Sequence, residues 1–222
     1  MKVDMDDLAH SMTDAIELAA LKPVLESLSK VVYGQSRNIK LALCCFLSRG
    51  HLLLDGVPGV GKTTMAKSLA TVLGLDFKRI QCTSDLLPSD VLGYSLYNAT
   101  SGEMTFQPGP IFSQTLLIDE LNRASPKTQS AFLEAMAERQ VTLDNMSHPL
   151  PEPFFVIATQ NPAQQLGTFP LPEAQLDRFL MSVHIDYPSK AAEQLLYREG
   201  HKTTVLDKAI DFATVKYLQN KV

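Results

Sequence analysis

The stretch GVPGVGKTT, from Gly56 to Thr64, constrains the fold more than any other part of this sequence. It matches the pattern G-x-x-x-x-G-K-[ST], whose glycines let successive backbone N–H groups turn inward around oxygen anions. The pattern predicts that Lys62 reaches the β- and γ-phosphates of a nucleotide and that the Thr63 hydroxyl binds Mg²⁺. The run HLLLD (51–55) just before it predicts a strand, and a helix is expected behind it. This context favours phosphate binding over a glycine turn beside a surface lysine.

A second apolar run, TLLID (115–119), predicts a strand that ends in two acids, Asp119 and Glu120. A buried parallel strand delivers its last residues to the edge of the sheet where ligands bind. We therefore expect Asp119 to hold the water shell of Mg²⁺ and Glu120 to polarise an attacking water. Alone, such a pair is more often a solvated strand end, but its pairing with the phosphate loop favours the functional interpretation. Glu120 favours ATP hydrolysis over transfer to another substrate, because no acceptor-binding motif is evident.

Three more side chains are candidates for the same site. The run FFVIATQNP ends at Asn161, whose amide is expected to reach the γ-phosphate or the water, although Asn-Pro alone is a turn signal. Arg178, in LPEAQLDRFL, and Arg123, in DELNRA, are candidates for an arginine supplied to a neighbouring subunit. The alternative for each arginine is an exposed ion pair of little energetic weight. Arg178 is the preferred candidate.

The remaining pattern predicts an α/β fold, a three-layer sandwich with about five parallel strands. Apolar runs separated by helical segments indicate a parallel sheet that is covered on both faces. Beyond the two strands above, we expect strands at 77–82, 154–159 and 181–186. Helices are predicted over 4–30 with a break at Pro23, 35–48, 63–73 ending at Gly74, 125–139 capped by Ser125, and 189–198 capped by Ser189 and followed by Gly200.

Two segments interrupt this alternation. Residues 92–110 and 139–150 read as short hairpins that turn near Ser101-Gly102 and Asp144-Asn145. Neither hairpin is needed to complete the sheet. They either face a partner or substrate or are plain surface loops, and both interpretations stay open.

Composition narrows the function classes. The chain has 222 residues, 20 Lys and Arg against 24 Asp and Glu, and a net charge of -4, which argues against a sequence-independent DNA-binding surface. No apolar run predicts a signal peptide or a membrane span, so we expect a cytoplasmic protein without nucleic-acid or membrane partners. Cys44, Cys45 and Cys82 lack metal-ligand spacing and are expected to be buried, reduced thiols.

These residues together resemble the AAA+ ATPases, specifically the MoxR branch, which is close to magnesium-chelatase ATPase subunits. The resemblance runs from about Val31 to Pro188. It is carried by ordered blocks: VVYGQ, GHLLLDGVPGVGKT, DLLPSDVLG, FQPGPIF, LLIDELNRA, AFLEAMAERQVTL, FFVIATQNP and FPLPEAQLDRF.

The resemblance implies a role for each matching position. Gly56 to Thr63 would be the Walker A loop, which binds ATP. Asp119 and Glu120 would form Walker B, Asn161 would be sensor 1 and Arg178 the arginine finger. The segment from Val32 to Gln35 matches the part that packs on adenine. The implied cofactor-binding residues are Val32, Gly34, Gly56, Pro58, Gly59, Val60, Gly61, Lys62, Thr63 and Thr64, and the implied Mg²⁺ residues are Thr63 and Asp119.

The family also implies an assembly and a domain plan. Members generally form hexameric rings and act as chaperone-like remodellers of partners, often with a von Willebrand A-domain protein, and the two hairpins tend to face the ring pore. The expected division is an N-terminal helical segment over 1–30, an AAA+ core over 31–187, and an incomplete helical lid over 188–222.

The sequence departs from the family at its end. No stretch resembling GASPR, which carries the sensor 2 arginine, is present. The leading hypothesis is thus a Mg²⁺-dependent ATPase, and the alternative is a nucleotide-binding assembly module with little hydrolysis. A small-molecule kinase or GTPase shares the phosphate loop, but the chain has no N-K-x-D motif for guanine.

Overall fold

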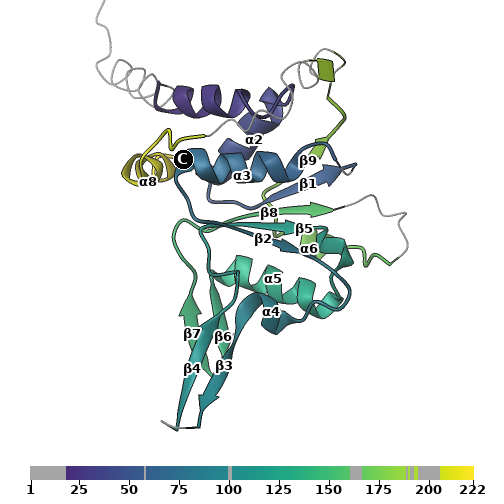
Figure 1. The fold of residues 1–222 in the computed structure, drawn as a ribbon, viewed down its shortest axis with the longest axis vertical. Coiled ribbons are helices and arrows are strands. Elements are labelled where there is room, and N and C mark those ends of the chain that lie inside the picture. The colour runs from purple at the N-terminus through teal and green to yellow at the C-terminus, as the bar shows by residue number, and fades with distance from the viewer. Residues whose placement is uncertain are drawn as a thin grey trace, which may run out of the picture.

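The fold is built on a parallel sheet of five strands, in the order β2-β5-β8-β1-β9 (Figure 1). This computed structural model describes residues 19–57, 59–99, 102–160, 167–188, 190, 193–194 and 206–222. Every predicted strand is present, shifted by no more than one residue at either end. The strands are β1 (Leu52–Gly56), β2 (Phe77–Gln81), β5 (Thr115–Asp119), β8 (Phe155–Gln160) and β9 (Met181–Ile185).

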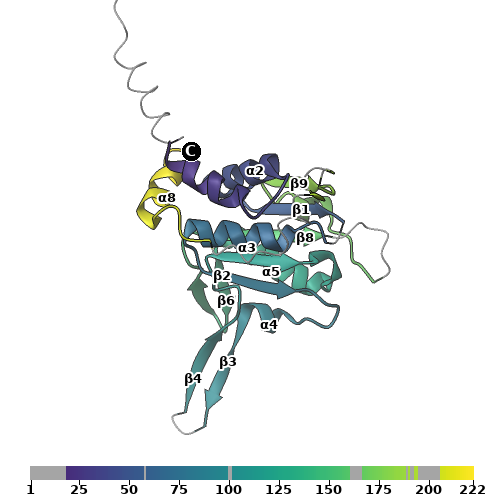
Figure 2. The same cartoon turned by 45° about the horizontal axis from the view of Figure 1, so that its top comes forward.

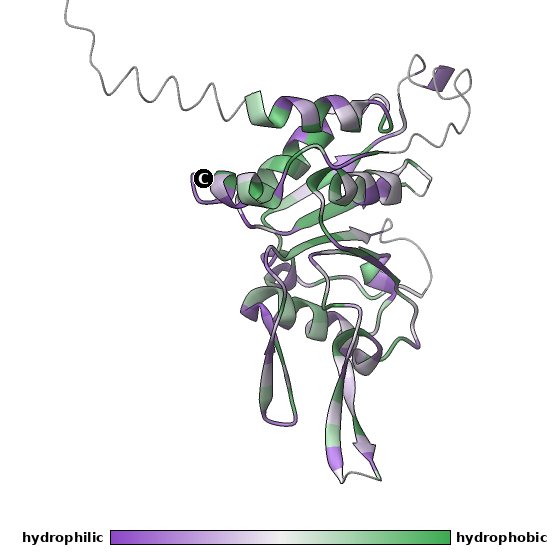
Figure 3. Ribbon diagram, turned by 60° about the vertical axis from the view of Figure 1, so that its left-hand side comes forward, coloured by the Kyte–Doolittle hydropathy of each residue, from purple (hydrophilic) through white to green (hydrophobic). Residues whose placement is uncertain are grey.

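Helices cover both faces of the sheet, which confirms the predicted α/β sandwich. Strand side chains alternate between the faces, so Leu52 and Leu54 enter one hydrophobic cluster while Leu53 enters the other. The first cluster holds residues of a helix over 19–29, α2 (Ser36–Leu47), α3 (Lys62–Leu73) and α8 (Phe212–Gln219). The second holds residues of α4 (Pro88–Leu92) and α5 (Pro126–Glu138). Figure 3 shows the apolar strands between these layers.

Two predicted helix boundaries are confirmed. Helix α3 ends at Gly74, whose φ of 67° is the left-handed conformation that glycine adopts without strain. Helix α5 begins after Ser125, whose side chain accepts a hydrogen bond from the Thr128 backbone N–H. Both ends therefore follow from local chemistry.

The predicted break at Pro23 is wrong, because the described helix runs through it from 19 to 29. Proline inside a helix costs about 3 kcal/mol through its missing N–H and its ring. The neighbouring Val24 is fully buried and Leu28 is almost so, and this packing offsets the cost. The first part of the predicted 4–30 helix lies outside the described residues.

The C-terminal part of the chain adds one helix that was not predicted. Helix α8 begins after Asp211, whose carboxylate accepts a hydrogen bond of 2.7 Å from the Thr214 N–H. Val215 and Leu218 on its inner face are buried. The helix predicted from Ser189 to Arg198, with Gly200 beyond it, lies outside the described residues except for 190, 193 and 194.

The two predicted hairpins are present and project from the α4 and α5 side of the sheet (Figures 1 and 2). One pairs β3 (Gly93–Asn98) with β4 (Glu103–Pro108), and the other pairs β6 (Gln140–Leu143) with β7 (Met146–Pro149). Ser95 Oγ donates to Asp144 Oδ2 over 2.6 Å, and the Phe106 and His148 rings stack with centroids 4.0 Å apart. The hairpins therefore contact each other, which the sequence did not indicate.

The cysteine prediction needs one correction. Cys45 and Cys82 are buried thiols, and burial raises the pKa of each to about 12. Cys44 is exposed, because adjacent positions on α2 point about 100° apart and only Cys45 faces the core.

No helix among the described residues is both long enough and apolar enough to cross a membrane.

Candidate active site

The loop between β1 and α3 takes up the conformation that its glycines allow. Gly59 and Gly61 have φ angles of 84° and 89°, a region that other residues rarely adopt. At Gly56 a side chain is also excluded by space, because a Cβ would lie 2.3 Å from the carbonyl oxygen of Ile185. The loop ends at the N-terminus of α3, a twelve-residue helix whose positive dipole end faces the same region.

Lys62, the first residue of α3, is held across this loop. Its side chain is buried, and Nζ donates to the carbonyl oxygens of Gly56 over 2.8 Å and of Gln160 over 3.4 Å. Burial lowers the pKa of Lys62, and the nearby carboxylates of Asp119, Asp55 and Glu120 oppose that shift. The ammonium is therefore preorganised at the carboxyl edge of β1 and β8.

Asp119 ends β5 beside the loop, and its two oxygens have different partners. Oδ1 accepts a hydrogen bond of 2.7 Å from the Thr159 hydroxyl. Oδ2 lies 3.4 Å from the Thr63 hydroxyl, which donates to it. The parallel pairing of β5 with β8 sets this geometry, because it brings the ends of both strands to one edge.

One open cleft contains these groups. The described residues that line it are Gly59, Gly61, Lys62, Thr63, Thr64, Arg79, Gln81, Asp119 and Glu120. Backbone amides, an ammonium and a helix N-terminus suit an anion, while a hydroxyl and a carboxylate oxygen suit Mg²⁺. The donor set therefore fits a metal-bound nucleotide triphosphate.

Glu120 has an unusual backbone for a residue with a side chain. Its φ of 57° is left-handed, and its N–H donates to the Thr159 hydroxyl over 2.8 Å. Such a conformation costs on the order of 1 kcal/mol and is often found at functional sites. The carboxylate pairs with Arg123, with Nη1 3.1 Å from Oε2, so Arg123 is engaged within its own subunit.

The fold and this cleft can now be compared with known proteins. A family model described as the ATPase family associated with various cellular activities (AAA) matches residues 51–181. The chaperone MoxR1 of Mycobacterium tuberculosis is 43% identical over 187 residues, which cover 84% of this chain. This chain belongs to the AAA family of ATPases, in its MoxR branch.

Two further similarities agree with that membership. An uncharacterized Bacillus subtilis protein, YeaC, is 49% identical over 205 residues, which cover 91% of this chain and 64% of that protein. The crystal structure of a proposed ATPase from Cytophaga hutchinsonii superposes with a TM-score of 0.83 at 41% identity, over 98% of this chain and 67% of that one. The match to MoxR1 covers 50% of that protein, so this MoxR-family chain spans about half to two thirds of the curated relatives.

Not all of the predicted site residues lie in the cleft of this AAA protein. Arg178 is exposed, in the turn after α6 (Glu173–Leu176), and does not line it. Val32 is buried in the first cluster, and Gly34, with a φ of 71°, follows it in the turn before α2. The side chain of Gln35 in that turn donates to the Asp186 carbonyl over 3.3 Å, which joins the turn to the end of β9. Pro58 and Asn161 lie outside the described residues.

Sequence reasoning missed two polar side chains that line the AAA cleft and a third, Thr159, that is buried beneath it against Asp119. Arg79 and Gln81 come from β2, the strand beside β5, and Thr159 comes from β8. Thr159 carries a usable signal, since it is a hydroxyl at the carboxyl end of an apolar strand. Arg79 carries none, because its contact depends on the order of strands in the sheet.

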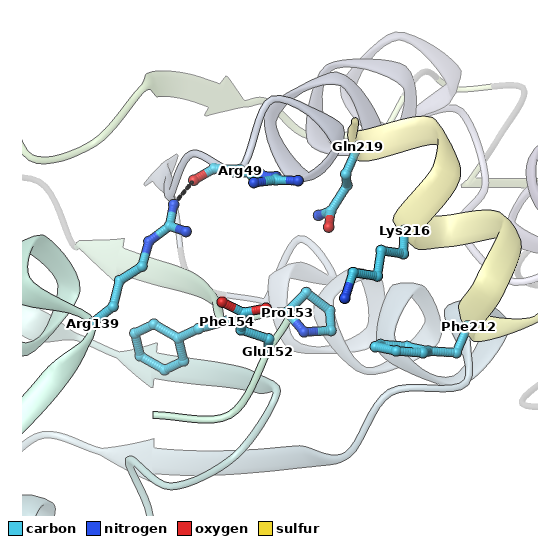
Figure 4. A pocket seen from close by; sticks show the side chains of 8 residues that line it. All are labelled: Arg49, Arg139, Glu152, Pro153, Phe154, Phe212, Lys216 and Gln219. Atoms are coloured by element: carbon cyan, nitrogen blue, oxygen red, sulfur yellow. Dashed lines mark hydrogen bonds between the residues drawn. The ribbon is translucent and has the colours of Figure 1, made fainter. Parts of the chain in front are cut away.

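A second cavity lies at the opposite, amino edge of the sheet (Figure 4). It is lined by Arg49, Arg139, Glu152, Pro153, Phe154, Phe212, Lys216 and Gln219. Arg139 Nη2 donates to the Arg49 carbonyl over 3.1 Å across it. None of these residues belongs to the predicted nucleotide site of this MoxR-type chain.

Proposed function

We propose that this chain binds Mg²⁺-ATP in the cleft between α3 and β5 and hydrolyses it. The observation that carries the proposal is the 3.4 Å approach of the Thr63 hydroxyl to Asp119 Oδ2, beside the buried ammonium of Lys62. Three contributions needed for phosphoryl chemistry thus meet at one edge of the sheet. The AAA family model covers the segment that contains all of them.

The residues of the cleft divide the work of hydrolysis. The amides of the loop and Lys62 bind the phosphates, while Thr63 and Asp119 hold Mg²⁺, which supplies neutralisation of the phosphate charge. Glu120, which lines the cleft directly after β5, accepts a proton from the attacking water. Asn161 orients the water or the γ-phosphate, with the adenine near Val32 and Gly34.

Arg178 completes the site in a neighbouring subunit. Its exposed position outside the cleft suits a residue that acts in trans on the γ-phosphate. We propose a hexameric ring, in which one subunit supplies the cleft and the next supplies the arginine. The relative MoxR1 is named a chaperone, which supports a chaperone-like role. We further propose that this chain remodels partner proteins, with a von Willebrand A-domain protein as one partner.

The domain plan remains part of the proposal. We propose that residues 31–187 form the AAA+ core, 1–30 an N-terminal helical segment and 188–222 part of a helical lid. The proposed site of action is the cytoplasm.

Glu120→Gln tests the proposal directly. The amide cannot take up a proton, so ATP turnover should fall by about 10²- to 10⁴-fold while ATP affinity stays within about twofold. Turnover is measured by phosphate release and affinity by calorimetry, with Glu134→Gln on the exposed face of α5 as the matched control.

Two outcomes would change the assignment. Undiminished turnover in the Glu120→Gln protein would exclude Glu120 as the base. ATP binding without turnover in the unsubstituted chain, at every protein concentration, would favour the alternative of a nucleotide-binding assembly module.

A further inference from the structure

Arg79 places a second cation on the carboxylate that is proposed to hold Mg²⁺. Its Nη2 and Nε both donate to Asp119 Oδ2, over 2.7 Å and 3.1 Å. This is the same oxygen that the Thr63 hydroxyl approaches, whereas Oδ1 is occupied by Thr159. The guanidinium and the metal's water shell therefore need the same lone pairs.

We propose that Arg79 is a displaceable counter-ion that holds Asp119 until Mg²⁺-nucleotide arrives and then leaves that oxygen. The inference rests on the proposed function, since it assumes that Asp119 serves the metal. Two cations sharing one carboxylate oxygen repel each other at this separation, so the arrival of the metal favours release of the arginine.

The surroundings of Arg79 allow that release. The Arg79 side chain is 48% exposed while the Asp119 side chain is 13% exposed, so the arginine can turn into solvent and the carboxylate stays in place. Gln81 lies two residues along the same strand face, and its Oε1 already accepts a bond of 2.9 Å from Arg79 Nη2. That amide remains as a partner after Asp119 is released.

A positive side chain at this position has two opposed effects. Without metal, Arg79 adds attraction for the phosphates of the nucleotide, since it lines the same cleft. With metal, it competes for Asp119. Removal of the charge should therefore weaken metal-free binding and at the same time lower the Mg²⁺ concentration that the complex requires. A residue that only supports the fold would not weaken metal-free binding and at the same time reduce the Mg²⁺ concentration that binding requires.

The test uses Arg79→Gln and Arg79→Lys in the full chain, with binding of a fluorescent non-hydrolysable ATP analogue as the readout. For Arg79→Gln, half-saturating Mg²⁺ should fall about two- to fivefold, and affinity in EDTA should fall by a similar factor, as expected for a partly exposed ion pair. Arg79→Lys keeps the charge and should keep the metal-free affinity. Lys78→Gln, on the neighbouring exposed position, should change neither quantity.

The outcomes separate this inference from the proposed function. A half-saturating Mg²⁺ concentration that is unchanged or raised in Arg79→Gln overturns the counter-ion role alone, provided the unsubstituted protein shows metal-dependent binding. If the unsubstituted protein shows no metal-dependent binding, the proposed function fails and the inference fails with it. Circular dichroism would reveal a loss of fold in Arg79→Gln. In that case Arg79→Lys tests the counter-ion role, which predicts that its half-saturating Mg²⁺ concentration does not rise.

Discussion

His51 is a buried histidine whose two ring nitrogens have fixed roles. Nδ1 accepts a hydrogen bond of 3.0 Å from the Val156 N–H, so Nε2 carries the proton and faces the Met136 carbonyl at 3.4 Å. Protonation of Nδ1 would break the first bond and place a charge in the core. Burial accordingly lowers the pKa of His51 from 6.5 to about 4.

This shift predicts acid sensitivity of the fold. The unfolded chain binds a proton near pH 6.5 and the folded chain near pH 4, so stability is full above the first value and falls as the pH drops between them. From about pH 7.5 to pH 5.5 the loss due to His51 should be about 1 kcal/mol. Urea unfolding at both pH values measures it, and His51→Gln should show a smaller loss. An equal loss in the variant would contradict the assignment.

At this scale the sequence predicts a residue when its role is set by its neighbours in the chain. Lys62 and Thr63 were predicted because one loop and one helix start position them. Arg79 was not, because it meets Asp119 only through the pairing of β2 with β5, strands that are far apart in the sequence. No local pattern encodes that pairing.

Helix α5 connects the cleft to the projecting hairpins and depends on its first turn. Ser125 Oγ accepts from the Thr128 N–H over 3.3 Å, and the Thr128 hydroxyl donates to the Leu86 carbonyl over 2.7 Å. Ser125→Ala should lower the free energy of unfolding by about 1 kcal/mol, because an N-terminal donor loses its acceptor. Chemical denaturation checks this value.

Ser130→Ala is the matched control on the same helix. Ser130 is exposed, and its hydroxyl donates back to the Pro126 carbonyl over 2.9 Å, a bond that contributes little to helix stability. Its replacement should change stability by less than about 0.5 kcal/mol. Equal effects of the two substitutions would show that the cap does not stabilise α5.

Element types were largely readable from the sequence, and their exceptions have physical causes. Apolar runs predicted the three central strands β1, β5 and β8 because these strands are buried on both faces, whereas the edge strands β2 and β9 also carry exposed polar residues. The Pro23 helix was misjudged since tertiary packing outweighed a local penalty. Helix α8 was missed because only Val215 and Leu218 among its residues are buried, too few for a clear helical period.

At the scale of the whole molecule, Arg178 does not line the cleft of its own subunit. The proposed role in a neighbouring subunit therefore predicts complementation between two inactive variants. Arg178→Ala alone and Glu120→Gln alone should each be nearly inactive in ATP turnover. A mixture of the two should regain activity, because interfaces form that combine an intact Glu120 with an intact Arg178. Phosphate release from mixtures at several ratios measures the recovery.

Protein concentration provides an independent check of the same arrangement. Turnover per subunit should rise with concentration in the unsubstituted chain, since in the proposed arrangement the arginine comes from a neighbouring subunit. Constant specific activity, or no recovery in the mixture, would mean that Arg178 does not act between subunits.

Helix α5 also has a mechanical consequence. Its thirteen residues form a rod about 20 Å long. The helix begins six residues after Glu120, and at its far end Arg139 leads directly into β6. In the proposed cycle, a small rotation at the first turn of α5 would therefore displace the β6–β7 hairpin at its other end by a larger distance.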